Sequence, residues 1–233
     1  MAYKRIDCID CSARENSLLG LCVDDELTSL SANKQCSIFK KGQVLFYEGN
    51  IANGLYCLNK GRVKIYKTGK DGKEQIIGFG LSGDFLGYRA LIAEQPHSTS
   101  VAALEDTIAC LIPKDEFYKV IEKNPEVSKQ LMKSLCLELG LAVEKIQSLS
   151  QKSVRERVAE TLIQLYDTFN NLRNPEQIID ITLPREDIAN IAGTSTESLI
   201  RSLSEMKNER LIELEGKKIK IIDFTKLERI ANP

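Results

Sequence analysis

The chain has 233 residues, of which 42% are hydrophobic and 28% are charged, with only 6 Pro and 14 Gly; these values exclude collagen-like, low-complexity and extensively disordered proteins. No uncharged apolar run approaches the roughly 18 residues of a bilayer span, and the N-terminus lacks the apolar core of a signal peptide, so we expect a soluble, cytoplasmic protein. The net charge of -1 provides no general attraction to nucleic acid, so any DNA-binding surface must be local.

The chain has seven cysteines, an odd number, and no export signal. These features argue against a disulfide scaffold and favour reduced thiols or metal ligands. The single histidine, His97, lies in no recognisable catalytic motif, and the G-x-S-x-G, H-E-x-x-H and P-loop patterns are missing. We therefore do not expect an enzyme.

Glycine punctuates the first half of the chain, with ten of the fourteen glycines within residues 42–87. Between and after them lie short β-rich runs at 44–47, 54–58, 63–66, 75–79, 100–104 and 108–112. Many short strands at regular spacing predict a jelly-roll sandwich over 35–113, preceded by a cysteine-containing helical segment at 1–34. Residues 68–73 suit a hairpin turn.

The pattern changes to a helical period after Pro113. Apolar residues recur at steps of three and four at Leu131, Leu135, Leu139, Ala142, Ile146 and Leu149. They predict a long amphipathic helix at roughly 126–150, within a helical region at 114–150. The stripe is either an ordinary core face or the seam of a coiled-coil dimer, and the sequence leaves both open.

The last segment, 151–233, carries the most specific local pattern. An amphipathic helix over 154–166 ends in a polar stretch at 170–175, a second helix begins at 184–187 and stops at Gly193, and a third restarts at 194–197 with a capping-box spacing. The inward positions of the third helix are Leu199, Leu203 and Met206, which leaves Thr196, Glu197, Ile200, Arg201 and Ser204 outside. This is a helix-turn-helix, and the apolar runs at 211–214 and 219–222 predict its hairpin wing.

Three motifs together resemble the Crp/Fnr transcription regulators: Gly61–Lys64, Gly83–Gly87 and, most specifically, Arg185–Arg201, which meets the family's helix-turn-helix pattern at every fixed position. The resemblance covers nearly the whole chain and extends to Bacteroidetes-type members of this bacterial family. It implies an α+β protein with a cyclic-nucleotide-binding-like double-stranded β-helix, a long dimerisation helix and a C-terminal winged helix-turn-helix.

The resemblance places the third helix in the major groove of DNA. Arg201 would then bind guanine, Glu197 would accept from cytosine or hold Arg201, and Ile200 would lie beside them. Ser195 and Thr196 would contact phosphate. The alternatives are a capping-box role alone for Glu197 and a solvated charge for Arg201, and the wing lysines Lys217, Lys218 and Lys220 are interpreted mainly as a solvated face.

The effector pocket departs from the cAMP-binding members of the family. Those members hold the cyclic phosphate with a glutamate after G-D-x-x-G and an Arg-Ser pair further on, where this chain has Tyr88 and Ser98-Thr99. Without the acid and the arginine we expect no tight cAMP binding. The candidate pocket residues are Gly87, Tyr88, Arg89, Ser98 and Thr99, and Arg89 keeps a different small anion open.

The oxygen-sensing branch of the family holds an iron-sulfur cluster on N-terminal cysteines and one cysteine of the β-roll. The resemblance therefore implies Cys8, Cys11, Cys22 and Cys110 as candidate metal ligands, although ten residues separate Cys11 from Cys22 where the sensors have a shorter spacer. A Cys8–Cys11 redox couple, a zinc site, or no effector at all are the alternatives. Otherwise Cys22, Cys36, Cys57, Cys110 and Cys136 would be small buried residues.

We therefore predict a homodimeric regulator that reads a near-palindromic double-stranded DNA operator and works with RNA polymerase, with dimerisation through the helix near 126–150. The rival from another class is a small-molecule sensor or interaction module that does not bind DNA. The effector is left undetermined by the sequence.

Overall fold

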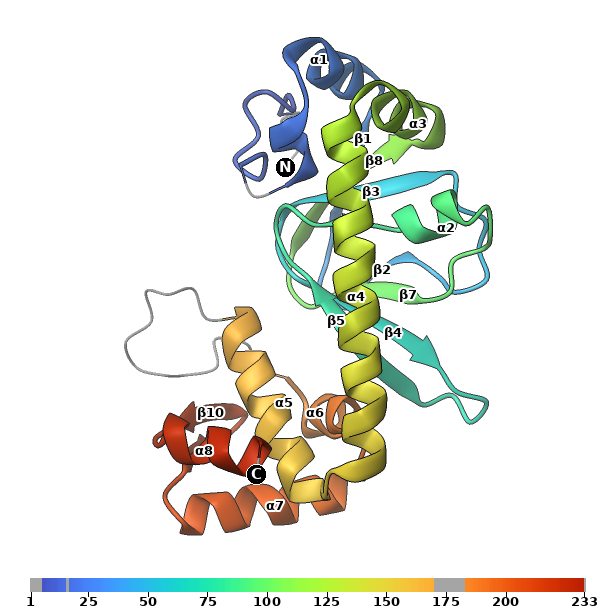
Figure 1. The fold of residues 1–233 in the computed structure, drawn as a ribbon. Helices are drawn as coiled ribbons and strands as arrows, with labels where there is room; N and C mark the ends of the chain where they lie inside the picture. The colour runs from blue at the N-terminus through green and yellow to red at the C-terminus, as the bar shows by residue number, and fades with distance from the viewer. Residues whose placement is uncertain (1–5, 16, 170–182, 233) are drawn as a thin grey trace. The chain divides into compact units, whose positions relative to one another are not determined.

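The computed structural model describes residues 6–15, 17–169 and 183–232, which form two compact units that divide after Glu138 (Figure 1). The predicted polar segment at 170–175 lies outside these residues. We describe the N-terminal unit, up to Glu138, and the C-terminal unit, from Leu139 on, separately. No helix of the described residues is both long enough and apolar enough to cross a membrane.

The N-terminal unit is a β-roll of two antiparallel sheets. One sheet has the order β1-β8-β3-β6 and the other has the order β2-β7-β4-β5. The strands are β1 (Gln35–Phe39), β2 (Val44–Phe46), β3 (Gly54–Lys60), β4 (Val63–Thr68), β5 (Glu74–Gly80), β6 (Phe85–Leu86), β7 (Ser100–Ala103) and β8 (Thr107–Pro113). Each predicted β-rich run is a strand, and the predicted turn at 68–73 joins β4 to β5.

The interior of the β-roll is apolar because alternate residues of a strand point to opposite faces of its sheet. Leu58 on β3 packs inside the roll with side chains of both sheets, among them Val63 and Val101. Its neighbours Leu55 and Cys57 belong to a second cluster on the other face of the strand. Strand β3 is therefore buried on both sides.

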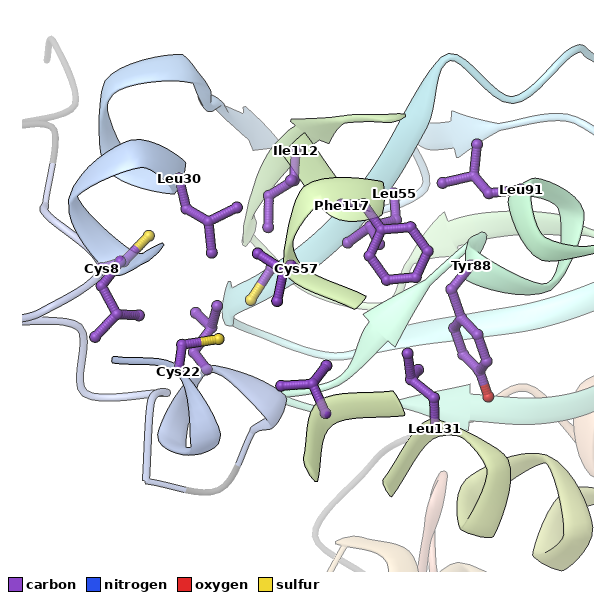
Figure 2. Packing of buried hydrophobic residues seen from close by; sticks show 14 residues of the cluster. Cys8, Cys22, Leu30, Leu55, Cys57, Tyr88, Leu91, Ile112, Phe117 and Leu131 are labelled. Carbon is purple, nitrogen blue, oxygen red and sulfur yellow. The ribbon is translucent and has the colours of Figure 1, made fainter. Parts of the chain in front are cut away.

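Helices cover this second face, and their apolar residues complete the cluster drawn in Figure 2. They are the 3-10 helix η1 (Leu18–Leu21), α1 (Asp24–Asn33), α3 (Lys114–Lys123) and the start of α4 (Pro125–Gln151); the short α2 (Tyr88–Ile92) also contributes. Cys8, Cys22 and Cys57 point into this cluster from the N-terminal segment and from β3.

The predicted apolar stripe of α4 has a buried part and an exposed part. Leu131 is buried and Leu135 packs against the same cluster, whereas Leu139 and Ile146 are 67% and 68% exposed. The core-face interpretation is therefore confirmed for the part around Leu131 and Leu135, and the dimer seam stays a prediction for the exposed part. Cys136, which we expected to be buried, is exposed, because position 136 lies on the side of α4 away from the core.

The C-terminal unit is a winged helix-turn-helix. Helix α5 (Val154–Phe169) packs against α6 (Arg185–Ala192), α7 (Thr196–Asn208) and α8 (Phe224–Ala231), and β9 (Ile212–Glu215) pairs with β10 (Lys218–Ile221) as the wing. The helices meet over fully buried side chains, among them Leu162, Leu199, Leu203, Met206 and Leu227. The predicted fold class is confirmed; the sequence analysis missed β1, β6, α2 and α8.

Candidate functional site

Helix α7 is positioned by a tight turn after α6. Gly193 ends α6 in the left-handed conformation at φ 62°, and a Cβ there would lie 2.4 Å from Cδ2 of Leu149. Only glycine adopts this conformation at low cost, and here it also lacks room for a side chain. The backbone then places Ser195 as the N-cap of α7.

The cap of α7 differs from the predicted capping box. The Ser195 hydroxyl oxygen accepts a hydrogen bond from the Ser198 backbone N–H at 3.2 Å, so the residue at the third helical position is Ser198 and Glu197 stands one residue earlier. The capping-box interpretation of Glu197 was therefore wrong, because the helix begins one residue later than the Thr194-based spacing implied.

The predicted inward and outward faces of α7 are both found. Leu199, Leu203 and Met206 are at most 1% exposed. Glu197, Ile200 and Arg201 are exposed on the other side, together with Ser195 at the cap. Within the described residues Arg201 has no hydrogen bond or ion pair, so its guanidinium is available to a ligand.

Arg157 on α5 is a positioning residue that the sequence analysis missed. Its Nε donates to the Ala192 carbonyl at 2.9 Å and its NH2 group donates to the Gly193 carbonyl at 3.1 Å, while its NH1 group donates to the Lys152 carbonyl at 2.7 Å. These carbonyls include two at the end of α6, where helix carbonyls lack partners within the helix. The guanidinium therefore holds the turn that sets the start of α7.

A second missed contact joins α6 to the wing. The Arg185 guanidinium donates to the carbonyls of Gly216 at 3.1 Å and Lys217 at 3.3 Å, in the turn between β9 and β10. Partial burial lowers the pKa of Arg185 from its usual value. Lys217 and Lys218 are exposed at the wing, as predicted, whereas Lys220, predicted to share this solvated face, is partly buried.

The N-terminal cysteines lie in buried surroundings. Cys8, Cys11 and Cys22 are 2%, 8% and 6% exposed. The Lys34 ammonium, itself 6% exposed, donates to the Cys8 sulfur at 3.2 Å and to the Ile6 carbonyl at 2.6 Å, and the Asn59 amide donates to the Cys11 sulfur at 3.1 Å. The sulfurs of Cys8 and Cys11 therefore each accept a hydrogen bond from a buried side chain.

The buried thiols of Cys22 and Cys57 have raised pKa values. Burial and the Glu26 carboxylate raise the pKa of Cys22 to about 12, and burial raises the pKa of Cys57 further. Cys57 was predicted to be a small buried residue, and it is 4% exposed within the second cluster.

The fourth candidate ligand has a covalent partner. Cys110 on β8 forms a disulfide with Cys36 on β1. The sequence favoured reduced thiols or metal ligands, and for Cys36 and Cys110 this expectation was wrong: cysteine count and compartment say nothing of strand register, which sets these two residues directly opposite each other. Within residues 6–15, 17–169 and 183–232, no three Cys, His, Asp or Glu side chains are grouped so that they could hold a metal ion.

The predicted effector residues do line one pocket, which Glu138 of α4 enters. The Tyr88 hydroxyl donates to Glu138 Oε1 at 2.5 Å, and the Arg89 guanidinium lies 3.5 Å from Glu138 Oε2. Burial and this hydrogen bond raise the pKa of Tyr88. The one arginine of the pocket is thus paired with a carboxylate of the protein.

The other side of the pocket is formed by 97–99. Thr99 is buried and Ser98 exposed, while His97, also buried, stacks on Phe46 with the ring centroids 3.9 Å apart. Gly87, in the left-handed conformation at φ 86°, brings its backbone so close that a Cβ would lie 2.9 Å from the His97 ring. The five predicted pocket residues are therefore brought together, with His97 and Glu138 as additional members.

Comparison with known proteins agrees with this architecture. Residues 37–124 match the cyclic nucleotide-binding domain and residues 156–230 match the Crp-like helix-turn-helix domain. The fumarate and nitrate reduction regulatory protein of Vibrio cholerae is 30% identical over 227 residues, which cover 97% of this chain and 90% of that protein. The electron transport regulator A of Shewanella oneidensis is also 30% identical, over 97% and 90% of the two chains.

The chain belongs to the Crp/Fnr family. It is a DNA-binding transcription regulator and not an enzyme.

Solved structures of Crp/Fnr-type proteins show the same fold. FixK2 from Bradyrhizobium japonicum matches with a TM-score of 0.74 at 24% identity, over 86% of this chain and 98% of that one. TTHA1359, a Crp/Fnr regulator from Thermus thermophilus, matches with a TM-score of 0.72 at 21% identity, over 85% and 99%. At these identities the likeness concerns the fold alone.

Proposed function

We propose that this Crp/Fnr regulator binds a near-palindromic operator as a homodimer, with α7 of each copy in successive major grooves and its side chains reading base edges. Half-sites of such a dimer lie about 34 Å apart, one turn of DNA. The observation that carries the proposal is the outward face of α7, where Arg201 is exposed and unpaired within the described residues.

The side chains on this face suit the contacts that DNA offers. Arg201 has the fork geometry that binds the O6 and N7 atoms of guanine, and Glu197, four residues earlier on the same face, can accept from a cytosine amino group or hold Arg201. Ser195 and Thr196 lie at the N-terminal end of the helix, where its dipole favours a phosphate. Ile200, which is exposed next to Arg201 in the chain, offers an apolar contact.

Dimerisation through α4 is supported by its exposed apolar residues. Met132, Leu139, Val143 and Ile146 are each at least 58% exposed, and they recur at steps of seven, four and three. This is the spacing of a two-stranded coiled-coil seam, and so large an apolar strip is uncommon on a monomer. The occupant that fits it is the same helix of a second copy.

The proposal is tested by replacing Arg201. Arg201→Ala should weaken binding to the preferred operator by about 1–3 kcal/mol and relax the base preference at one position of each half-site. Lys207→Ala is the matched control, because it removes the same charge from an exposed position on another side of α7. Equal losses for the two variants, or none for Arg201→Ala, would contradict the assigned role.

We further propose that the N-terminal unit receives a signal other than cAMP. A cyclic phosphate in the pocket would meet the carboxylate of Glu138, and Arg89 is already paired with it. Titration calorimetry with cAMP should detect no binding at micromolar concentrations, and micromolar affinity would refute this part. RNA polymerase remains the proposed protein partner.

A redox signal is the second candidate, because the N-terminal cysteines are buried and the Lys34 ammonium donates a hydrogen bond to the Cys8 sulfur. An iron-sulfur cluster, if bound, would supply redox-sensitive chemistry at the implied ligands Cys8, Cys11, Cys22 and Cys110. These residues do not fit the cluster while Cys110 is bonded to Cys36, because a disulfide sulfur provides no thiolate.

A further inference from the structure

The disulfide lies in a row of cysteines that crosses three strands. Cys36 on β1 and Cys57 on β3 both stand directly opposite Cys110 on β8, one on either side. Residues opposite each other in an antiparallel ladder project from the same face of the sheet. Cys110 therefore has two sulfur-bearing neighbours on one face, and it is bonded to Cys36, at a Cα–Cα distance of 3.9 Å.

The face that carries this row is the face covered by the N-terminal segment. Cys57 and Ile112, which is two residues beyond Cys110 and so on its side of β8, both belong to the cluster that contains Cys8 and Cys22 (Figure 2). A released Cys110 thiol would thus lie on the side of the sheet where the N-terminal cysteines pack.

The two sulfurs of the disulfide differ in access. Strand β1 is an edge strand, and Cys36 is partly exposed, whereas Cys110 is 6% exposed. A thiol reductant attacks the sulfur that it can reach, so attack is directed to Cys36 and Cys110 is the leaving group.

We propose that the Cys36–Cys110 bond is a redox-active cross-strand disulfide, whose reduction frees the Cys110 thiol beside Cys57 on the face of the sheet where the N-terminal cysteines pack. The reactivity of the bond does not rest on the function proposed above. A dithiol reductant forms a mixed disulfide with Cys36 and breaks the Cys36–Cys110 bond, and Cys110 leaves as a thiolate that takes a proton. The second thiol of the reductant then closes the reductant's own disulfide and releases Cys36, so two electrons and two protons reach the protein.

The test measures how the fraction of protein with the Cys36–Cys110 bond depends on the ratio of reduced to oxidised dithiothreitol. The full-length protein is equilibrated with graded ratios of reduced and oxidised dithiothreitol, quenched in acid, unfolded, alkylated and mapped by mass spectrometry. We expect a 36–110 cross-link that is lost in a two-electron transition as the ratio rises. No such cross-link in the oxidised protein, a 57–110 cross-link in its place, or persistence at the most reducing ratio would overturn the proposal.

Two variants control this test. Cys57→Ser removes the other neighbour of Cys110 and should leave the 36–110 transition unchanged, whereas Cys36→Ser should remove it and leave Cys110 fully alkylated. A 57–110 cross-link that forms in wild type, or a Cys57→Ser variant that lacks the 36–110 cross-link, would contradict the assignment. If Cys36→Ser fails to fold, the wild type and Cys57→Ser alone decide the result.

Discussion

The two units differ in how far their functional side chains lie apart along the chain. In the C-terminal unit the cap, the turn and the exposed face of α7 come from one stretch, 193–201, and a helical period places them. In the N-terminal unit the cysteines and pocket residues come from separate strands and helices, brought together by sheet register and packing. The exposed face of α7 can therefore be recognised in a local pattern, whereas the pocket members His97 and Glu138 and the Cys36–Cys110 pair cannot.

The largest expected effect tests whether the exposed apolar residues of α4 form the dimer interface. Ile146→Glu would place two carboxylates in an apolar seam, so we expect the dimer to weaken by about 3 kcal/mol or more and specific operator binding to be lost. Sedimentation equilibrium measures the dimer constant. Gln151→Glu adds the same charge at an exposed position on another side of the helix and should change it little. An unchanged constant for Ile146→Glu would place the interface elsewhere.

A second substitution tests whether the C-terminal unit needs a contact from outside residues 193–201, namely the hydrogen bonds of Arg157. Arg157→Met removes the hydrogen bonds to the Lys152, Ala192 and Gly193 carbonyls, so it should lower the free energy of unfolding by about 2–4 kcal/mol and weaken operator binding. Arg155→Met on the same helix is the control, because Arg155 makes only exposed ion pairs, with Glu205 and Glu209, and these contribute little. Similar losses for both variants would remove Arg157 as a positioning residue.

The smallest expected effect is a pH dependence of the stability of the N-terminal unit, caused by His97. Burial lowers the pKa of His97, the only histidine of the chain, so the unfolded state binds its proton more readily than the folded state. The folded state therefore has its full stability above the pKa that His97 has in the unfolded state, near 6.5. It loses part of that stability as the pH falls below this value, because the unfolded state takes up the proton first. Differential scanning calorimetry between about pH 7.5 and 5.5 should show a small decrease in the stability of the N-terminal unit.

His97→Phe keeps the ring against Phe46 and should flatten this pH dependence. The same slope in the variant would assign the effect to other groups.

Much of the fold follows from the sequence because periodicity and glycine spacing report local structure. The patterns predict the long helix, the helix-turn-helix and every strand of the β-roll except β1 and β6. The Cys36–Cys110 bond and the exposure of Cys136 could not be predicted, because strand register and the docking face of a helix depend on tertiary packing.

The candidate sites divide along the same line. The exposed residues of α7 were found because a helix with buried Leu199 and Leu203 must present Arg201 outward. Arg157 was missed because its targets are backbone carbonyls some 35 residues away, and no side-chain pattern marks a carbonyl. Glu138 was missed because it reaches the pocket from α4, 50 residues beyond Tyr88, and no local pattern reports that packing.

The most direct test of the central claim is selection of binding sites from a random double-stranded DNA pool by the full-length protein, repeated with Arg201→Ala. The account predicts enrichment of a near-palindrome whose half-sites are about one helical turn apart, with a guanine preference that the variant loses. Recovery of a single asymmetric site, or of no preferred sequence, would contradict a homodimer that reads DNA through α7.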